Sequence, residues 1–323
     1  MNLPALGIDI AKLKFNVCLI REDGKFSHKV FANTRAGFSQ LSAWLTAHHV
    51  PQVHACLEAT GAYGEALATY LADAGHRTSV INPAAIKAYA GCQLSRTKTD
   101  KVDAELIARF CLTQNPPVWT PAAPEIRELQ ALVRRLDALI EMHTMEQNRL
   151  SSGTAVAAVT ASIQNVIEGL EREIKHTEKL IKGHIKSYPT LKADRDLLLS
   201  IPGIGEATTA RLLSEINFHQ YATARSVAAF TGLVPRLRQS GTSVRGKARL
   251  SKVGSPRIRH ALYFPAVTAL RCNPVIKAWA QGLRERGKCE MQIISAVMRK
   301  LIHLAYGVLK SGKLYDPLYA QNA

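Results

Sequence analysis

Several features that would place a chain in a common class are missing from these 323 residues. The six cysteines are scattered and form no C-x-x-C pair, which excludes a disulfide framework and a zinc site of familiar spacing and indicates a reduced, cytoplasmic protein. No basic segment followed by an apolar one opens the chain, so no signal peptide is expected. The apolar run at residues 261–270 is too short to cross a bilayer and contains Pro265, so no membrane partner is expected.

Acidic residues are missing from one long basic stretch. No Asp or Glu occurs from residue 216 to residue 284, and the formal net charge of the whole chain is +17. Because a solvated surface normally mixes both signs of charge, this stretch is predicted to bind the phosphates of a nucleic acid. Its candidate nucleic-acid-binding residues are Arg236, Arg238, Arg245, Lys247, Arg249, Lys252, Arg257 and Arg259.

The first third of the chain alternates strands and helices. Strands are predicted at residues 6–10, 14–20, 26–31, 53–57 and 78–81, with an Asp-Gly turn between the second and the third. Helices are predicted at residues 35–48 and 61–75, and another begins after Thr99, whose side chain can cap it. This order predicts an α/β domain with a mixed sheet of the ribonuclease-H-like kind.

Four carboxylates fall at one end of this predicted sheet. Asp9 lies on the first strand, and Glu58 ends the strand that we expect beside it. Asp100 and Asp103 lie three residues apart, on one face of a helix that packs across the same end. Acids that repel one another here can hold two divalent cations, Mg²⁺ or Mn²⁺, which clamp the oxygens of a phosphodiester. The alternatives are an ordinary acidic first helical turn, and a Glu58 that caps the turn at Thr60.

A proline-rich linker is predicted at residues 116–124, and the spacing of apolar residues changes after it. Apolar residues then recur every three or four positions in two runs, residues 126–143 and 163–181, which predict an antiparallel coiled-coil hairpin. Its seam includes Leu129, Val133 and Leu136. The seam either packs on its own domain or joins protomers, and its narrowness favours self-association.

Two glycine-containing segments follow the hairpin. LLSIPGIG at residues 198–205 resembles a helix-hairpin-helix turn whose amides approach a DNA phosphate, and a plain glycine-rich helix connection is the alternative. QSGTSVRG at residues 239–246 is predicted to be a flexible loop between arginines. A serine in this loop either makes ordinary phosphate or loop hydrogen bonds or acts as a nucleophile, because nearby guanidinium groups stabilise an attacked phosphate.

Seven motifs, in this order along the chain, resemble those of one known family. They are GIDIAKLKF (7–15), LEATG (57–61), VINP (80–83), KTDKVDA (98–104), IPGIG (201–205), GLVPR (232–236) and SGTSVRG (240–246). The set resembles the IS-one-ten family of bacterial insertion-sequence transposases, DEDD-type recombinases guided by a bridge RNA. The resemblance spans essentially the whole chain.

The resemblance implies a Holliday-junction-resolvase-like domain at residues 1–120, a coiled coil at 121–190 and a mainly α-helical transposase domain at 191–323. The implied catalytic residues are the metal ligands Asp9, Glu58, Asp100 and Asp103 and the nucleophile Ser240. Mg²⁺ is the implied cofactor, and Mn²⁺ is expected to substitute for it.

The reaction implied by this resemblance cuts and rejoins donor and target DNA through a phosphoserine intermediate, guided by a noncoding bridge RNA. A homo-oligomer, either a dimer or a tetramer, is implied as well. We expect it in the bacterial cytoplasm, associated with the nucleoid.

Three other functions share part of this pattern. A metal-dependent Holliday-junction-type nuclease would use the four acids with water as its nucleophile and would not need Ser240. GIDIAKLKF also resembles the first phosphate loop of an actin-like ATPase or sugar kinase, but the second glycine-rich phosphate hairpin is missing after Glu58. A non-catalytic RNA-binding protein has no use for four converging acids. Within the serine mechanism, Ser243 is the competing nucleophile, and the motif favours Ser240.

Overall fold

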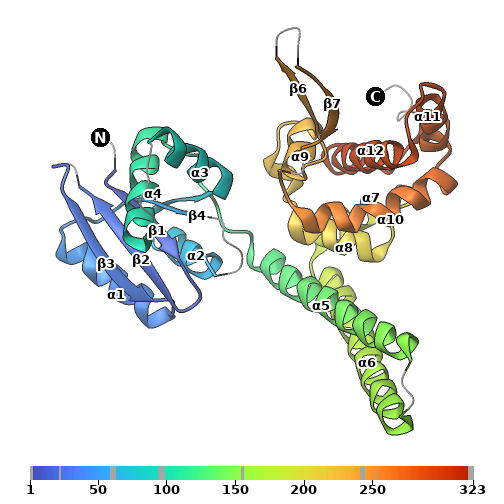
Figure 1. Ribbon diagram of the computed structural model, residues 1–323, viewed down its shortest axis with the longest axis horizontal. Helices are drawn as coiled ribbons and strands as arrows, with labels where there is room; N and C mark the ends of the chain where they lie inside the picture. Colours follow the sequence, from blue (N-terminus) through green and yellow to red (C-terminus); the bar gives the residue numbers. More distant parts are fainter. Residues whose placement is uncertain are drawn as a thin grey trace. The chain divides into compact units, whose positions relative to one another are not determined.

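The computed structural model describes residues 3–21, 23–58, 63–93, 99–153, 156–240, 244–251 and 253–318; within residues 237–248 it describes the backbone only. The chain forms two compact units, Met1–Pro121 and Ala122–Ala323 (Figure 1). The first contains a mixed β-sheet covered by helices, and the second is mainly helical. In the described ranges, no helix combines the length and the apolar character needed to cross a membrane.

The described part of the first unit is built on a five-stranded sheet in the order β3-β2-β1-β4-β5. Three strands, β1 (Ala5–Ile10), β2 (Lys14–Ile20) and β3 (Phe26–Ala32), form an antiparallel meander. Two more, β4 (His54–Glu58) and β5 (Arg77–Ile81), run parallel to β1. The five predicted strands are confirmed to within one residue at each end, and so is the pairing of β4 beside β1.

Helices cover both faces of this sheet. Buried residues of α1 (Arg35–Ala47) and α2 (Glu65–Asp73) pack with alternate residues of β1 such as Leu6 and Ile8. On the other face, α3 (Pro83–Cys92) and α4 (Asp100–Gln114) pack on Ala5 and its neighbours. Sequence reasoning missed α3, although Asn82 caps it and Pro83 follows at its first position, a common start signal.

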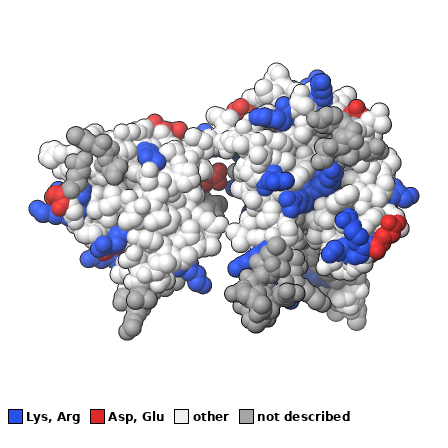
Figure 2. Space-filling model, turned by 90° about the horizontal axis from the view of Figure 1, so that it is seen from above, with Lys and Arg blue, Asp and Glu red and all other residues white. Residues whose placement is uncertain are grey.

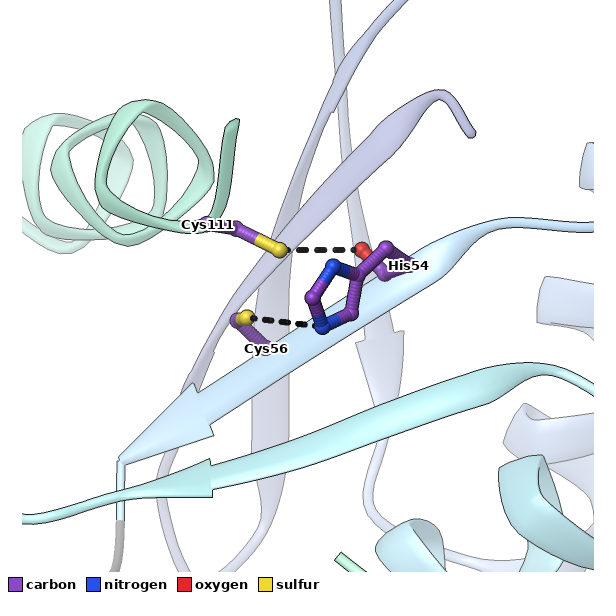
Figure 3. Close-up of side chains that lie close together, drawn as sticks. All are labelled: His54, Cys56 and Cys111. Carbon is purple, nitrogen blue, oxygen red and sulfur yellow. Dashed lines mark hydrogen bonds between the residues drawn. The ribbon is translucent and has the colours of Figure 1, made fainter. Parts of the chain in front are cut away.

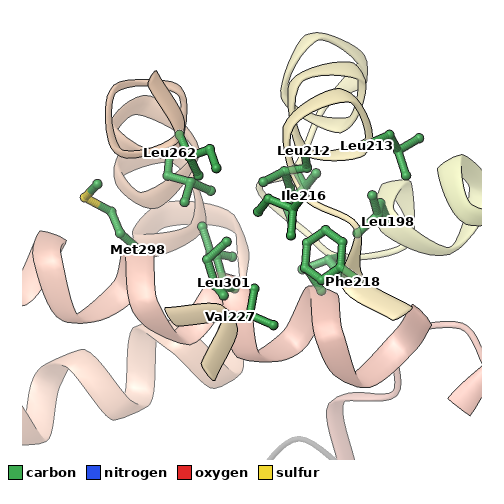
Figure 4. Packing of buried hydrophobic residues seen from close by; sticks show 14 of the residues in the cluster. Leu198, Leu212, Leu213, Ile216, Phe218, Val227, Leu262, Met298 and Leu301 are labelled. Carbon is green, nitrogen blue, oxygen red and sulfur yellow. The ribbon is translucent and has the colours of Figure 1, made fainter. Parts of the chain in front are cut away.

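The second unit begins with a long helical hairpin, α5 (Pro124–Ser152) and α6 (Ala157–Ser187), as predicted. The remaining elements are α7 (Pro189–Leu199), α8 (Glu206–Glu215), the 3₁₀ turn η1 (Phe218–Gln220), α9 (Ala224–Phe230), β6 (Pro235–Ser240), β7 (Val244–Leu250), α10 (Pro256–Cys272), α11 (Pro274–Glu285) and α12 (Glu290–Ser311). Aliphatic side chains of α7, α8, α10 and α12, among them Leu198, Leu212, Leu262 and Leu301, fill the core of this unit (Figure 4).

The base of the hairpin belongs to this same core. Leu129, Val133 and Leu136 are only 0%, 3% and 6% exposed and pack in one cluster with Leu212 of α8. They are therefore not available to join protomers, which corrects the expectation for these three residues. The physical reason is that the regular spacing of apolar residues shows that one face of a helix is buried, but not which surface buries it.

Candidate active site

The two-residue alternation of the strands places the first two acids on one face of the sheet. Leu6 and Ile8 of β1 pack toward α1 and α2, so Asp9, like Ala5, belongs to the face that α4 covers. On β4, Leu57 packs on the α1 and α2 side, which puts Glu58 on the same face as Asp9. Ile8 pairs with Leu57 in the parallel ladder, so Asp9 and Glu58 are neighbours at the carboxyl ends of their strands.

Helix α4 lies directly on β1 at this end of the sheet. A Cβ atom at Gly7 would collide with the backbone of Ala104 and Ala108, so only glycine allows the helix to come this close. The first turn of α4, which carries Asp100 and Asp103, is thereby brought to Asp9. Gly7 is thus a positioning residue for the acidic site, a role that sequence analysis did not assign to it.

The start of α4 is capped as predicted. The Thr99 side chain accepts a hydrogen bond from the Val102 amide at 3.3 Å. Asp100, the first helical residue, accepts hydrogen bonds from Lys14 Nζ at 3.0 Å and from Asn16 Nδ2 at 3.4 Å. The Lys14 contact lowers the pKa of Asp100 below its usual range.

Lys14 and Asn16 were missed as members of the site. They lie two residues apart on β2, hence on one face, and Asn16 is in register with Asp9. Once β1 and β2 are recognised as a hairpin, this pairing identifies both residues.

The pKa of Asp9 is perturbed by its surroundings. Its pKa is raised from 3.8 to about 6, first by partial burial and then by the negative charges of Asp103, Asp100 and Glu58, while Lys14 opposes the shift. All four acids thus lie within electrostatic reach of one another. Ionising Asp9 at neutral pH is costly, and a nearby cation would offset that cost.

The donors suit a hard divalent cation. All four are carboxylates, the ligands that Mg²⁺ and Mn²⁺ prefer. In the described residues, however, no three of their oxygens lie within 4.8 Å of one another. The ammonium group of Lys14 lies 3.0 Å from the Asp100 carboxylate and brings one positive charge to the cluster. The turn at Thr60, which Glu58 would cap in the alternative interpretation, lies outside the described residues.

The predicted nucleophile Ser240 belongs to the second unit. It is the last residue of β6 and pairs with Val244 of β7 in an antiparallel ribbon. Residues 239, 240 and 244–246, expected to be loop, are strand residues, because Gln239 pairs with Arg245 and Ser240 with Val244. Residues 241–243, including Ser243, lie outside the description, as does the side chain of Ser240.

Arginines face each other across this ribbon. Arg236 and Arg249 are exposed and directly opposite in register. Like charges in such a pair are destabilising unless an anion lies between or over them. An anion lying over this pair would therefore relieve the repulsion between the two guanidinium groups. Arg238, Arg245 and Lys247 lie in the same two strands, and only their backbone is described.

Two of the arginines predicted to bind nucleic acid, Arg257 and Arg259, interact with other residues of the second unit. The Arg259 guanidinium donates to the carbonyl groups of Thr231 and Gly254, each at 3.1 Å. Nη1 of Arg257 lies 3.6 Å from Oε1 of Glu215, and the Arg257 side chain is 58% exposed. Arg259 thus braces the start of α10, and Lys252 lies outside the described residues.

The two glycines of the turn between α7 and α8, Gly203 and Gly205, lie in different surroundings. Gly203 has a φ of +105°, and a Cβ there would lie 2.7 Å from Cβ of Ala269, so this glycine serves internal packing. Gly205 precedes α8 and has open space around its Cα. The packing of Gly203 supports the plain helix connection that was the alternative to a DNA-binding turn.

Basic side chains are spread over the surface of the second unit. Figure 2 shows many lysines and arginines and few acidic residues on the visible face of this unit, the one drawn to the right. The two units thus carry opposite local charge patterns, an acidic site on the first and a basic surface on the second.

Two family models match the chain. Residues 6–153 match a DEDD-type model described as Transposase, and residues 195–281 match one described as Transposase IS116/IS110/IS902 family. The pilin gene-inverting protein of Moraxella lacunata is 33% identical over 320 residues, which cover 98% of each chain. The transposase for insertion sequence element IS1111A of Coxiella burnetii is 26% identical over 317 residues, covering 88% of this chain and 84% of that one.

These matches define an enzyme of the transposase and recombinase class, which acts on DNA. The chain belongs to the IS110 family of insertion-sequence transposases, the IS-one-ten family that its motifs resemble. The DEDD-type match also indicates the use of a divalent metal ion.

Proposed function

We propose that this chain is a bridge-RNA-guided transposase that uses Mg²⁺ and forms a phosphoserine at Ser240. The observation that carries the proposal is the electrostatic coupling of Asp9 to Glu58, Asp100 and Asp103 in a unit of a strongly basic protein. An antiparallel meander followed by two parallel strands, in the order 3-2-1-4-5, supports a ribonuclease-H-like assignment of that unit. In this reading the four acids hold the metal ions.

The residues of the chain divide the reaction between them. Bound metal ions would neutralise the carboxylates and polarise the oxygens of the scissile phosphate. Ser240 Oγ forms a bond to phosphorus while the bond from phosphorus to the departing deoxyribose oxygen breaks. Asp9, whose pKa is raised to about 6 in the metal-free site, would give up its proton when a metal ion binds, and the proton of the Ser240 hydroxyl would pass to water. Because one phosphodiester replaces another, the reverse attack rejoins DNA without ATP.

The basic ribbon and the helices around it hold nucleic-acid backbones. Base pairing between the bridge RNA and the DNA can carry the sequence specificity, so the protein needs only phosphate contacts of the kind that Arg236 and Arg249 offer. The second unit would then divide into a coiled coil at 121–190 and a transposase domain at 191–323. The dimer or tetramer would assemble through the distal half of the hairpin, where Met145 and Val166 are 52% and 47% exposed.

The test is a covalent trap. The full chain is incubated with Mg²⁺, the noncoding RNA of the element and a nicked donor DNA, and peptides are analysed by mass spectrometry. A DNA adduct on Ser240, lost in Ser240→Ala and retained in the matched control Ser243→Ala, is expected. An adduct on Ser243 would contradict the assignment, and cleaved DNA without an adduct would favour the nuclease that uses water.

A further inference from the structure

A second cluster of ligand-type side chains lies on the sheet face that also carries the acids. His54 and Cys56 are two residues apart on β4, and Cys111 lies near the end of α4 (Figure 3). Their exposed fractions are 5%, 0% and 1%. One ligand atom from each lies within 4.8 Å of the other two, and among the residues that the structure describes no other three His, Cys, Asp or Glu meet this distance.

The His54 ring is oriented by a hydrogen-bond chain. Nε2 lies 2.8 Å from Ser79 Oγ, and Ser79 Oγ lies 2.8 Å from the carbonyl oxygen of Pro117. When the hydroxyl donates its single hydrogen to that carbonyl, its oxygen accepts the N–H of Nε2. Nδ1 then keeps its lone pair. Nε2 also lies 3.9 Å from Cys56 Sγ, so a metal ion bound at Nε2 would displace the hydrogen bond to Ser79, whereas one bound at Nδ1 would keep it, the arrangement typical of metal-binding histidines (Figure 3).

The side chains of Cys56 and Cys111 interact directly. The hydrogen bond between them lowers the pKa of Cys111 and raises that of Cys56, and the positive charge of Arg77 favours the thiolate form of both. Thiolate is the form that binds metals. Ligand atoms on a tetrahedral zinc ion are about 3.5–4 Å apart, so the three side chains need to close by no more than about 1 Å.

A cavity of about 420 Å³ reaches the cluster, and its lining includes His54, Cys111, Arg77 and Thr113. It offers an entry path and room for a water as the fourth ligand, both of which a metal site requires. We propose that His54, Cys56 and Cys111 form a binding site for a thiophilic metal ion, Zn²⁺, distinct from the carboxylate site. This proposal does not depend on the proposed function.

Binding there would fasten α4 to β4. Cys111 lies eight residues after Asp103, about 12 Å along the helix. As a neutral thiol, Cys111 donates to the carbonyl oxygen of His54 at 3.3 Å, so α4 and β4 touch at this point, and metal binding would replace that proton. A metal ion would hold the strand that ends at Glu58 against the helix that begins at Asp100.

The test uses the full chain, reduced and freed of metal, and titrated with Co²⁺ and then with Zn²⁺. One equivalent of Co²⁺ should give tetrahedral d–d bands and a thiolate charge-transfer band, both abolished by Zn²⁺. Cys56→Ser and Cys111→Ser should lose both bands. Cys92→Ser, which alters an exposed cysteine of the same unit, should keep them. Circular dichroism shows that each variant is folded.

A second variant tests the orienting hydrogen bond without touching a ligand. Ser79→Ala should bind Zn²⁺ about 10–100-fold more weakly, as expected when the partner of a metal-binding histidine is lost. Zn²⁺ should also raise the melting temperature of the wild type and not that of Cys56→Ser. Folded wild type without cobalt bands would overturn the proposal. A Cys56–Cys111 disulfide in wild type that binds no Zn²⁺ would assign the pair to redox chemistry instead.

Discussion

The two units of this transposase arrange charge in opposite ways. The first gathers four carboxylates at one end of a sheet, where the other three raise the cost of ionising Asp9. The second spreads arginines and lysines over a stretch that holds no acid between residues 216 and 284. A compact cluster of like charge needs a small, highly charged counterion, whereas a dispersed one suits a polymer of phosphates. The comparison therefore predicts that the first unit binds metal ions and the second binds nucleic-acid phosphates.

The largest effect should come from removing an acid. Asp9→Asn is expected to slow strand cleavage at least about a thousandfold while leaving DNA binding unchanged, because a bound metal ion supplies several kcal/mol of transition-state stabilisation. Cleavage of supercoiled donor plasmid with Mg²⁺ and the noncoding RNA measures it. The matched control Asp73→Asn, at an exposed end of α2, should be fully active. Full activity of Asp9→Asn would contradict a catalytic role for the four acids.

The next effect separates the two halves of the hairpin. Leu129→Ala is expected to lower the free energy of unfolding by about 2–5 kcal/mol, because its side chain is fully buried in the core of the second unit. Met145→Ala, in the distal half, should change it by less than about 0.5 kcal/mol. Urea denaturation measures both. Similar losses would mean that the distal half is buried as well.

The approach of α4 to β1 is tested at Gly7. Gly7→Ala is expected to cost about 1–3 kcal/mol, because the added Cβ meets the backbone of Ala104 and Ala108 and must push the helix away. Gly91→Ala is the matched control, since its Cβ meets open space in α3 and should stabilise the protein by roughly 0.5–1 kcal/mol. Chemical denaturation compares them, and a neutral Gly7→Ala would contradict the close contact.

The raised pKa of Asp9 makes a prediction about pH. A carboxyl group with a raised pKa binds more protons in the folded state, so its destabilising effect grows as pH rises from about 4 to about 6. After a discount for solvent screening, metal-free Asp9→Asn should be more stable than wild type by about 1 kcal/mol at pH 7. The gain should vanish below pH 4. Thermal unfolding in EDTA across this pH range measures the difference in stability between the two proteins. A difference that does not change with pH would show that the pKa of Asp9 is not raised in the folded state.

The smallest effect per residue belongs to the basic ribbon. Arg236→Ala and Arg249→Ala should each weaken DNA binding equally for unrelated sequences and lower the slope of log affinity against log salt by about 1. Arg172→Ala, an exposed arginine of α6 outside the acid-free stretch, is the control. An unchanged salt slope in the double variant would show that the ribbon does not contact phosphates.

The sequence by itself determined the strands of the first unit, the hairpin helices and the cap of α4, because each depends on local period or a capping side chain. The Asp-Gly turn is an example, since Gly24 has a φ of +75°. It also indicated the acids, because their chain positions fall where strands end and a helix begins. Motifs alone named Ser240, and its assignment stays a prediction.

Only the tertiary structure decided which surfaces meet. It buried Leu129 inside its own unit, turned Arg259 inward to two carbonyl groups, and set Lys14 against Asp100. It also brought Cys111 close to His54 and Cys56, and no short sequence motif contains all three residues. The physical reason is the same in each case. Period and composition show that a side chain needs a partner, whereas the partner is chosen by the packing of elements far apart in the chain.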